Sequence, residues 1–243
     1  MKYLMGAAAG LLMSATMADA QVEDWRSRAD EAALQQGEVH LGLFYEGEED
    51  GFMRLGWYRR GDEIHIYDRS MWASRELYET LEGRVETASL APLEFHIRLH
   101  QASNYYQIDV AFDDDTATGE RRLVAPGQDD ATRPVNQELP EGTIARATLF
   151  LLAAVAPLEL GQRFAMDWYE PTSDSVEPVV LTAAEQVDVE TPAGVFTTLR
   201  LEQRGGEPAN DIFVDIESGR IVRIDIAGMP MQFLALPEPA GAG

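Results

Sequence analysis

Apolar and polar residues alternate along most of this chain, and that alternation constrains its fold more than any other feature. Residues 39–45 place Val39, Leu41 and Leu43 on one face, with His40 on the other. The same period of two recurs at 53–57, 64–67, 94–100, 105–112, 163–169, 177–190, 195–201, 212–216, 222–226 and 231–236. Because successive side chains of a strand point to opposite faces, the pattern predicts about ten strands of a half-buried sheet.

One segment departs from this pattern. Residues 143–155 (TIARATLFLLAAV) are apolar on almost every side and lie between Pro140 and Pro157, which predicts a buried helix. Arg146 and the short length argue against a membrane span. Residues 23–36 are expected to form a short amphipathic helix that Gly37 ends. The fold class predicted is mainly β (α+β), a curved antiparallel half-barrel of about ten strands wrapping one buried apolar helix.

Two segments leave alternatives open. Residues 71–90 fit either a helix or an irregular strand. Residues 113–139 are rich in Asp, Gly, Pro and Gln, and they fit either a long surface loop or a weak hairpin.

The first twenty residues have the three parts of a secretory signal peptide. Lys2 supplies a charged start, residues 4–17 are apolar, and the sequence Ala18-Asp19-Ala20 is a small-x-small cleavage site. A buried N-terminal helix is the alternative. We expect cleavage after Ala20 and a periplasmic or secreted protein. The predicted organisation is a signal peptide at 1–20, a single domain at 21–237 and a disordered tail at 238–243.

Composition excludes several classes of function. The chain has 42 acidic and 19 basic residues, for a formal net charge of −23. Nucleic acid binding requires a basic face, so a nucleic acid partner is not expected. The chain has no cysteine, which excludes disulfides, thiolate zinc sites, cysteine nucleophiles and a lipid-modified N-terminal cysteine.

The second half of the chain carries a family resemblance. Leu160-Gly161 precedes an aromatic strand at 164–169, residues 191–196 read TPAGVF, and residues 214–223 read VDIESGRIVR. These segments resemble the secreted bacterial proteins of unknown function catalogued as DUF3108. That family is similar in shape to the lipoprotein-localisation factors LolA and LolB. The resemblance implies a curved antiparallel half-barrel closed by helices, and it supplies no catalytic residues.

Motifs for chemistry are sparse. The nucleophile elbow G-x-S-x-G and the phosphate-binding glycine loops are absent, and S-x-x-K is excluded because Lys2 is the only lysine. The four histidines fall on the polar faces of predicted strands, which favours solvated side chains over a zinc site. The acidic runs at 113–115 and 129–130 fit solvated loops better than a calcium loop. We therefore expect no metal, no cofactor and no catalytic residue.

Aromatic residues are the most suggestive set. The candidate lining of a ligand pocket is Trp57, Phe95, Tyr106, Phe150 and Trp168, and the alternative is that these residues only fill the core. The leading interpretation is an exported, non-enzymatic cell-envelope protein that binds or shuttles a hydrophobic ligand, such as a lipid, an acyl chain or a lipoprotein. One alternative is an envelope interaction or scaffold module whose acidic surface meets a protein partner. Another is a hydrolase that uses carboxylates.

Overall fold

A computed structural model describes residues 28–113, 115–156 and 158–237. The strands are β1 (Gln36–Tyr45), β2 (Glu48–Arg60), β3 (Glu63–Trp72), β4 (Leu77–Glu86), β5 (Pro92–Gln101), β6 (Asn104–Asp113), β7 (Thr116–Val124), β8 (Ala131–Glu138), β9 (Ile144–Ala145), β10 (Arg163–Glu170), β11 (Ser175–Thr191), β12 (Gly194–Arg204), β13 (Asn210–Asp215), β14 (Ile221–Ile226) and β15 (Met231–Ala235). The α-helix is α1 (Thr148–Val155), and a short 3-10 turn, η2 (Ala73–Arg75), joins β3 to β4. The predicted signal peptide and C-terminal tail lie outside the described residues.

All fifteen strands belong to one sheet, in the order β8-β7-β6-β5-β4-β3-β2-β1-β15-β14-β13-β12-β11-β10-β9. Every neighbouring pair is antiparallel except β9 and β10. The first and last strands meet in the middle of the sheet, where Leu41 of β1 lies opposite Ala235 of β15. The sheet does not close, because β8 and β9 remain as its two edges. The mainly β class is confirmed.

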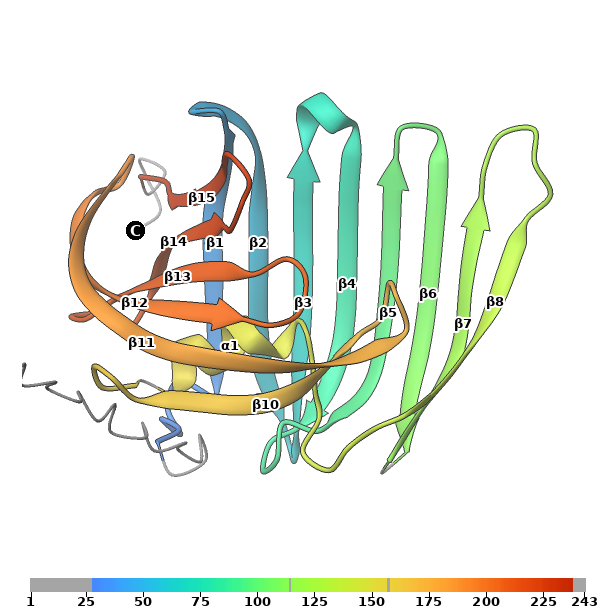
Figure 1. Ribbon diagram of the computed structural model, residues 1–243, viewed down its shortest axis with the longest axis horizontal. Coiled ribbons are helices and arrows are strands. Elements are labelled where there is room, and N and C mark those ends of the chain that lie inside the picture. The colour runs from blue at the N-terminus through green and yellow to red at the C-terminus, as the bar shows by residue number, and fades with distance from the viewer. Residues whose placement is uncertain (1–27, 114, 157, 238–243) are drawn as a thin grey trace, which may run out of the picture.

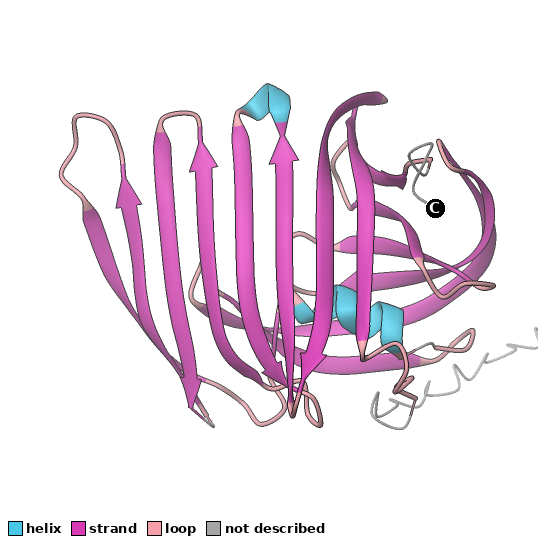
Figure 2. Ribbon diagram, turned by 180° about the vertical axis from the view of Figure 1, so that it is seen from behind, coloured by secondary structure: helices cyan, strands magenta, loops and turns pink. Residues whose placement is uncertain are grey.

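The sheet folds over into two layers. Strands β1–β8 stand side by side, and β10–β13 run across the face of the first of them (Figure 1). The view from behind shows the long strands of the first layer side by side, with η2 at the turn between β3 and β4 (Figure 2). Near-perpendicular crossing of two sheets is one of the two standard ways in which sheets pack.

The expected count of about ten strands is wrong. Of the alternatives left open, residues 77–86 form a strand, β4, and the polar stretch at 113–139 forms the hairpin of β7 and β8 rather than a long loop. Strand β8 is an edge strand that is exposed along most of its length and contains Pro134. An edge strand buries little, so its sequence shows weak alternation.

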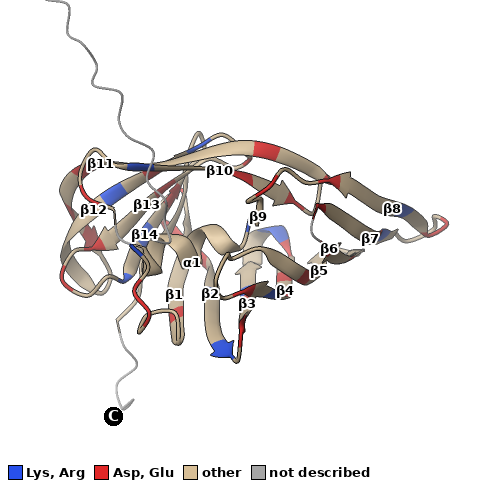
Figure 3. Cartoon of the chain, turned by 90° about the horizontal axis from the view of Figure 1, so that it is seen from below, with Lys and Arg blue, Asp and Glu red and all other residues tan. Residues whose placement is uncertain are grey.

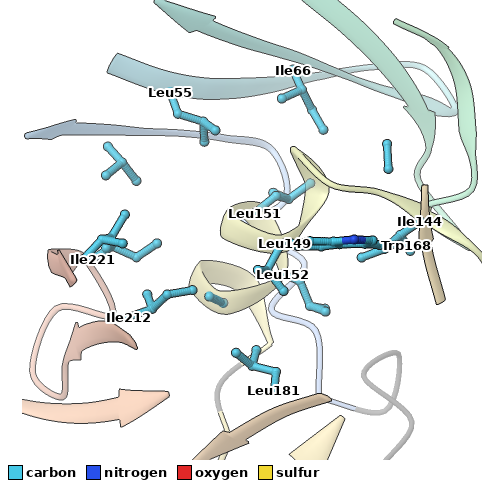
Figure 4. Close-up of a cluster of buried hydrophobic side chains, with 14 of the residues drawn as sticks. Leu55, Ile66, Ile144, Leu149, Leu151, Leu152, Trp168, Leu181, Ile212 and Ile221 are labelled. Carbon is cyan, nitrogen blue, oxygen red and sulfur yellow. The ribbon is translucent and has the colours of Figure 1, made fainter. Parts of the chain in front are cut away.

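Helix α1 lies between the two layers (Figure 3). Its leucines point toward Leu55 and Ile66 of the first layer on one side and toward Ile212 of the second layer on the other (Figure 4). Leu149, Leu151 and Leu152 are buried. This contact with apolar surface on both sides explains why the helix sequence has no polar face.

Both predicted helices need correction. The central helix is shorter than 143–155, because Ile144 and Ala145 pair with Trp168 and Tyr169 of β10 as strand β9. Of the helix expected at 23–36, residues 23–27 lie outside the described part. Residues 28–35 form turns, and β1 begins at Gln36.

Candidate functional site

The inner face of the first layer, which faces α1 and the second layer, carries two carboxyl groups. Ile64 and Ile66 of β3 are buried on this face, and Asp68 and Ser70 follow them at the same parity. Glu79 of β4 lies directly opposite Ser70. Asp68 and Glu79 are therefore diagonal neighbours on one face, with Cβ atoms about 7 Å apart.

The second layer places an ion pair, with a buried glutamate and a partly exposed arginine, against these carboxyls. Arg146, just before α1, donates from Nη1 to Glu170 Oε2 at 2.9 Å. Glu170, at the end of β10, is only 5% exposed, and Thr172 Oγ1 donates to its other oxygen at 2.6 Å. Arg146 lies near enough for its charge to lower the pKa of both Asp68 and Glu79.

Burial dominates the electrostatics of the two inner carboxyls. It is the largest cause that raises the pKa of Asp68, and the negative charge of Glu79 adds to it, so that the pKa reaches about 7. A hydrogen bond from Ser70 Oγ to Asp68 Oδ1, at 2.8 Å, opposes this shift. Burial likewise raises the pKa of Glu79, Arg146 opposes the shift and Glu170 adds to it.

The inner cluster is short of positive charge. The charge of Glu79 acts on Asp68, the charge of Glu170 acts on Glu79, and Arg146 is the only cation whose charge opposes the raised pKa values of Asp68 and Glu79. Within the described residues, the Glu79 carboxyl has no hydrogen bond or ion pair of its own. Both Asp68 and Glu79 are half-buried, so solvent still reaches them. A carboxylate that is shielded from water needs a hydrogen-bond donor or a cation as partner. The inner cluster can therefore accept one further donor or cation.

Three of the five predicted aromatic residues are tightly packed in the core. Trp57 donates from Nε1 to the Ala33 carbonyl at 2.9 Å. Phe95 packs over Gly83, where an added Cβ would come within 2.4 Å of the ring. Trp168 is fully buried. These three belong to one cluster with α1, in keeping with the alternative that such residues fill the core.

Tyr106 and Phe150 are both half-buried. Phe150, on α1, packs against the core cluster. Tyr106 lies on the inner face of β6, opposite Leu99 of β5 and Leu123 of β7, which are half-buried as well. These three residues lie toward the ends of β5–β7 that extend beyond the crossing strands of the second layer (Figure 1). Tyr106 is the predicted residue best placed to meet a ligand.

A chain of aromatic contacts links the two layers beside the carboxyls. The rings of Phe95 and Phe112 meet edge to face at 6.1 Å, and Phe112 meets Tyr169 of β10 at 5.4 Å. Tyr169 Oη donates to Asp174 Oδ1 at 2.9 Å, and Arg121 of β7 lies 3.6 Å from the other oxygen of Asp174. The turn after β10 is thereby fixed over the first layer.

The sequence pattern did not identify Asp68, Glu79, Glu170 and Arg146 as site residues. A signal was present, because Asp68 continues the buried parity of Ile64 and Ile66, and Arg146 interrupts an otherwise apolar segment. Arg146 meets Glu170 because β9 pairs with β10. The approach of this pair to Asp68 and Glu79 depends on the folding of the second layer over the first, which the alternation does not encode.

The histidines lie on the opposite, outer face of the sheet. His40 and His65 contact aromatic rings of β2, His100 contacts Tyr105, and His96 Nδ1 lies 2.7 Å from Asp109 Oδ1. Over the described ranges, no group of three or more His, Asp or Glu side chains is placed to hold a metal ion. In the same part of the chain, no helix is long and apolar enough to cross a membrane.

The fold and the site define a class: an open antiparallel sheet folded into two layers, with an acidic cluster on its inner face. The chain belongs to the family described as "Protein of unknown function (DUF3108)", whose match covers residues 64–229. The predicted family is thus confirmed. No curated protein and no solved structure matches the chain, so the likeness in shape to LolA and LolB stays a prediction.

Proposed function

We propose that this protein is exported to the cell envelope, with its signal peptide removed after Ala20, and that it binds an amphiphilic ligand without transforming it. The apolar chain of the ligand lies on the inner face of β5–β7, against Leu99, Tyr106 and Leu123. Its head group, a hydrogen-bond donor or a cation, meets Asp68 and Glu79.

The observation that carries this proposal is the charge deficit of the inner face. Arg146 is the only positive charge that acts on the two half-buried carboxyl groups, and it already forms an ion pair with Glu170. Half-buried apolar side chains lie on the same face of the neighbouring strands. A ligand with an apolar chain and a donor head satisfies both features, because apolar burial and a charge-assisted hydrogen bond each stabilise the complex.

Helix α1 limits where such a ligand binds. Its leucines are buried between the layers, so the space beneath the crossing strands is already filled. The ligand therefore binds beside the helix, over the part of the inner face that the second layer leaves uncovered.

Three probes with the same alkyl chain test the proposal: dodecylamine, dodecanol and dodecanoate. Binding to the mature protein is measured by isothermal titration calorimetry below the micellar concentration, with salt added to screen the acidic surface. We expect dodecylamine to bind at least about tenfold more tightly than dodecanol, because a charge-assisted hydrogen bond contributes about 1.5–3 kcal/mol. Dodecanoate is expected to bind most weakly.

Two variants locate the site. Asp68→Asn combined with Glu79→Gln is expected to remove the preference for the amine, while Tyr106→Ala weakens all three probes. Asp188→Asn, at an exposed aspartate of β11, is the matched control and is expected to change nothing. Equal binding of the three probes, or an amine preference that survives the double substitution, would overturn the proposal.

A second candidate function, carboxylate-based hydrolysis, is favoured by one observation. Asp68, with a pKa near 7, lies beside a second carboxyl group, and such a pair can divide the roles of acid and base. A panel of nitrophenyl esters and glycosides tests this function. Turnover that is lost in Asp68→Asn and kept in Asp188→Asn would support it, and no turnover would count against it.

A further inference from the structure

The outer face of the first layer contains a hollow that the inner site does not use. Its volume is about 760 Å³, within the range of about 300–1,000 Å³ that small-molecule sites occupy. It extends across β2–β5, over a row in which Tyr58, His65, Arg84 and Glu94 lie opposite one another on successive strands. These side chains point away from the core, so a ligand here does not compete with one on the inner face.

An exposed aromatic ring forms one wall of the hollow. Tyr58 is 46% exposed, and its ring stacks on His65 with centroids 4.9 Å apart and planes 9° apart. The stack fixes the orientation of the tyrosine ring before a ligand arrives. A fixed aromatic face receives the apolar face of a flat ligand at low entropic cost.

Ion pairs between arginine and glutamate side chains fix the rest of the lining of the hollow. Arg84 donates to both oxygens of Glu63 at 2.8 Å and to Glu94 at 2.7 Å. Arg69 donates to Glu82 at 2.7 Å. Because these groups are tied to one another, they present fixed donors and acceptors on their remaining edges.

The charge of the hollow indicates what it binds. Three arginines and three glutamates line it, whereas the whole chain has 42 acidic and 19 basic residues. A locally neutral surface on so acidic a protein selects neither a cation nor an anion. Within the described residues, no group of metal ligands forms here either. The hollow is therefore best suited to a neutral ligand that has many hydroxyl groups around an apolar ring face.

We propose that this outer hollow binds a neutral saccharide, with one pyranose ring stacked on Tyr58 and its hydroxyl groups bound by Arg84, Glu63 and Glu94. The ring carbons carry the C–H groups that meet an aromatic face, and vicinal hydroxyls match the paired oxygens and nitrogens of carboxylate and guanidinium groups.

Saturation-transfer NMR tests this proposal on the mature protein, with maltose, cellobiose and N,N′-diacetylchitobiose as probes. We expect at least one of the three to bind with a Kd of about 1 mM or lower, with transfer strongest at the protons on one ring face. The Tyr58→Ala variant is expected to weaken that binding about tenfold or more. Tyr78→Ala is the matched control, because Tyr78 is 40% exposed on the outer face of β4 and does not line the hollow.

Two further measurements keep the outcome clear. Tyr58→Leu retains an apolar side chain of similar reach and removes the ring, so it separates stacking from fold should Tyr58→Ala fail to fold. Dodecylamine added at saturation is expected to leave saccharide binding unchanged, which separates this site from the inner one. Absence of transfer to all three probes, or equal binding by the Tyr58 and Tyr78 variants, would refute the proposal.

Discussion

Asp68→Asn is expected to stabilise this protein at neutral and alkaline pH, although it replaces a carboxyl group that accepts a hydrogen bond. Burial and the charge of Glu79 raise the pKa of Asp68 from 3.8 to about 7. The folded protein therefore holds a proton on Asp68, between about pH 4 and pH 7, that the unfolded chain has released. The contribution of Asp68 to stability falls as the pH rises through this window and does not change further above it.

The magnitude follows from the size of the shift. A difference of about three pKa units corresponds to about 4 kcal/mol at 1.36 kcal/mol per unit. Because Asp68 is half-buried and solvent relieves part of the cost, we expect Asp68→Asn to gain about 2–4 kcal/mol at pH 8 and little at pH 4. The amide keeps an oxygen that accepts from Ser70 Oγ, so the local hydrogen bond survives.

Urea denaturation from pH 4 to pH 9 checks this expectation. The variant is expected to lose most of the fall in stability between pH 4 and pH 7, and its midpoint at pH 8 is expected to rise by about 1 M or more. Asp188→Asn is expected to retain the wild-type dependence. A variant that is no more stable than wild type at pH 8, with an unchanged slope, would refute the reasoning about the inner face. Gain of stability together with loss of amphiphile binding is the signature of a residue retained for function.

Four other substitutions test the packing and the ion pair of Glu170. Gly206→Ala places a Cβ at left-handed φ within 2.0 Å of a buried tryptophan ring, so we expect the free energy of unfolding in urea to fall by about 3 kcal/mol. Gly161→Ala is its control, because Gly161 has a similar φ but open space around it, and we expect it to cost only about 1 kcal/mol. Leu151→Ala leaves a cavity beneath α1, and a loss of about 3–4 kcal/mol by thermal unfolding is expected, whereas a loss below 1 kcal/mol would show that α1 repacks freely. Arg146→Gln removes the cation that pairs with buried Glu170. Because Arg146 is partly exposed and Thr172 still donates to Glu170, we expect a cost of about 1–2 kcal/mol in urea unfolding, and an unchanged midpoint would contradict this reasoning.

The alternation of residues predicted most of the first layer because each of its central strands buries one face. Val39 and Leu41, or Phe95 and Ile97, are buried where the pattern places them. At β7 and β8 the pattern could not decide between a loop and a weak hairpin, because strands that are exposed along most of their length show little alternation. It failed at Ile144 and Ala145, where pairing with β10 overrides an apolar segment that reads as helix.

The candidate site was less accessible to sequence reasoning than the fold. Trp168 and Phe95 were identified as apolar lining, and the structure places them in the packed core. Asp68 and Glu79 come from the consecutive strands β3 and β4, whereas Glu170 comes from β10, far along the chain. The approach of Glu170 to the other two carboxyls depends on how the sheet folds over, a long-range property that local periodicity does not contain.

Because β1 pairs with β15, the centre of this sheet can form only when the last strand has been synthesised. Strands β2–β8 can pair with their neighbours as soon as they exist, because each contact spans only a short hairpin. Strand β1 must wait for residues 231–235 before its second edge is covered. A chain truncated before Met231 therefore exposes two unpaired strand edges in the middle of the protein, where chains associate most readily. The final strand thus joins the two halves of the sheet, and the fold is complete only after nearly the whole chain has emerged.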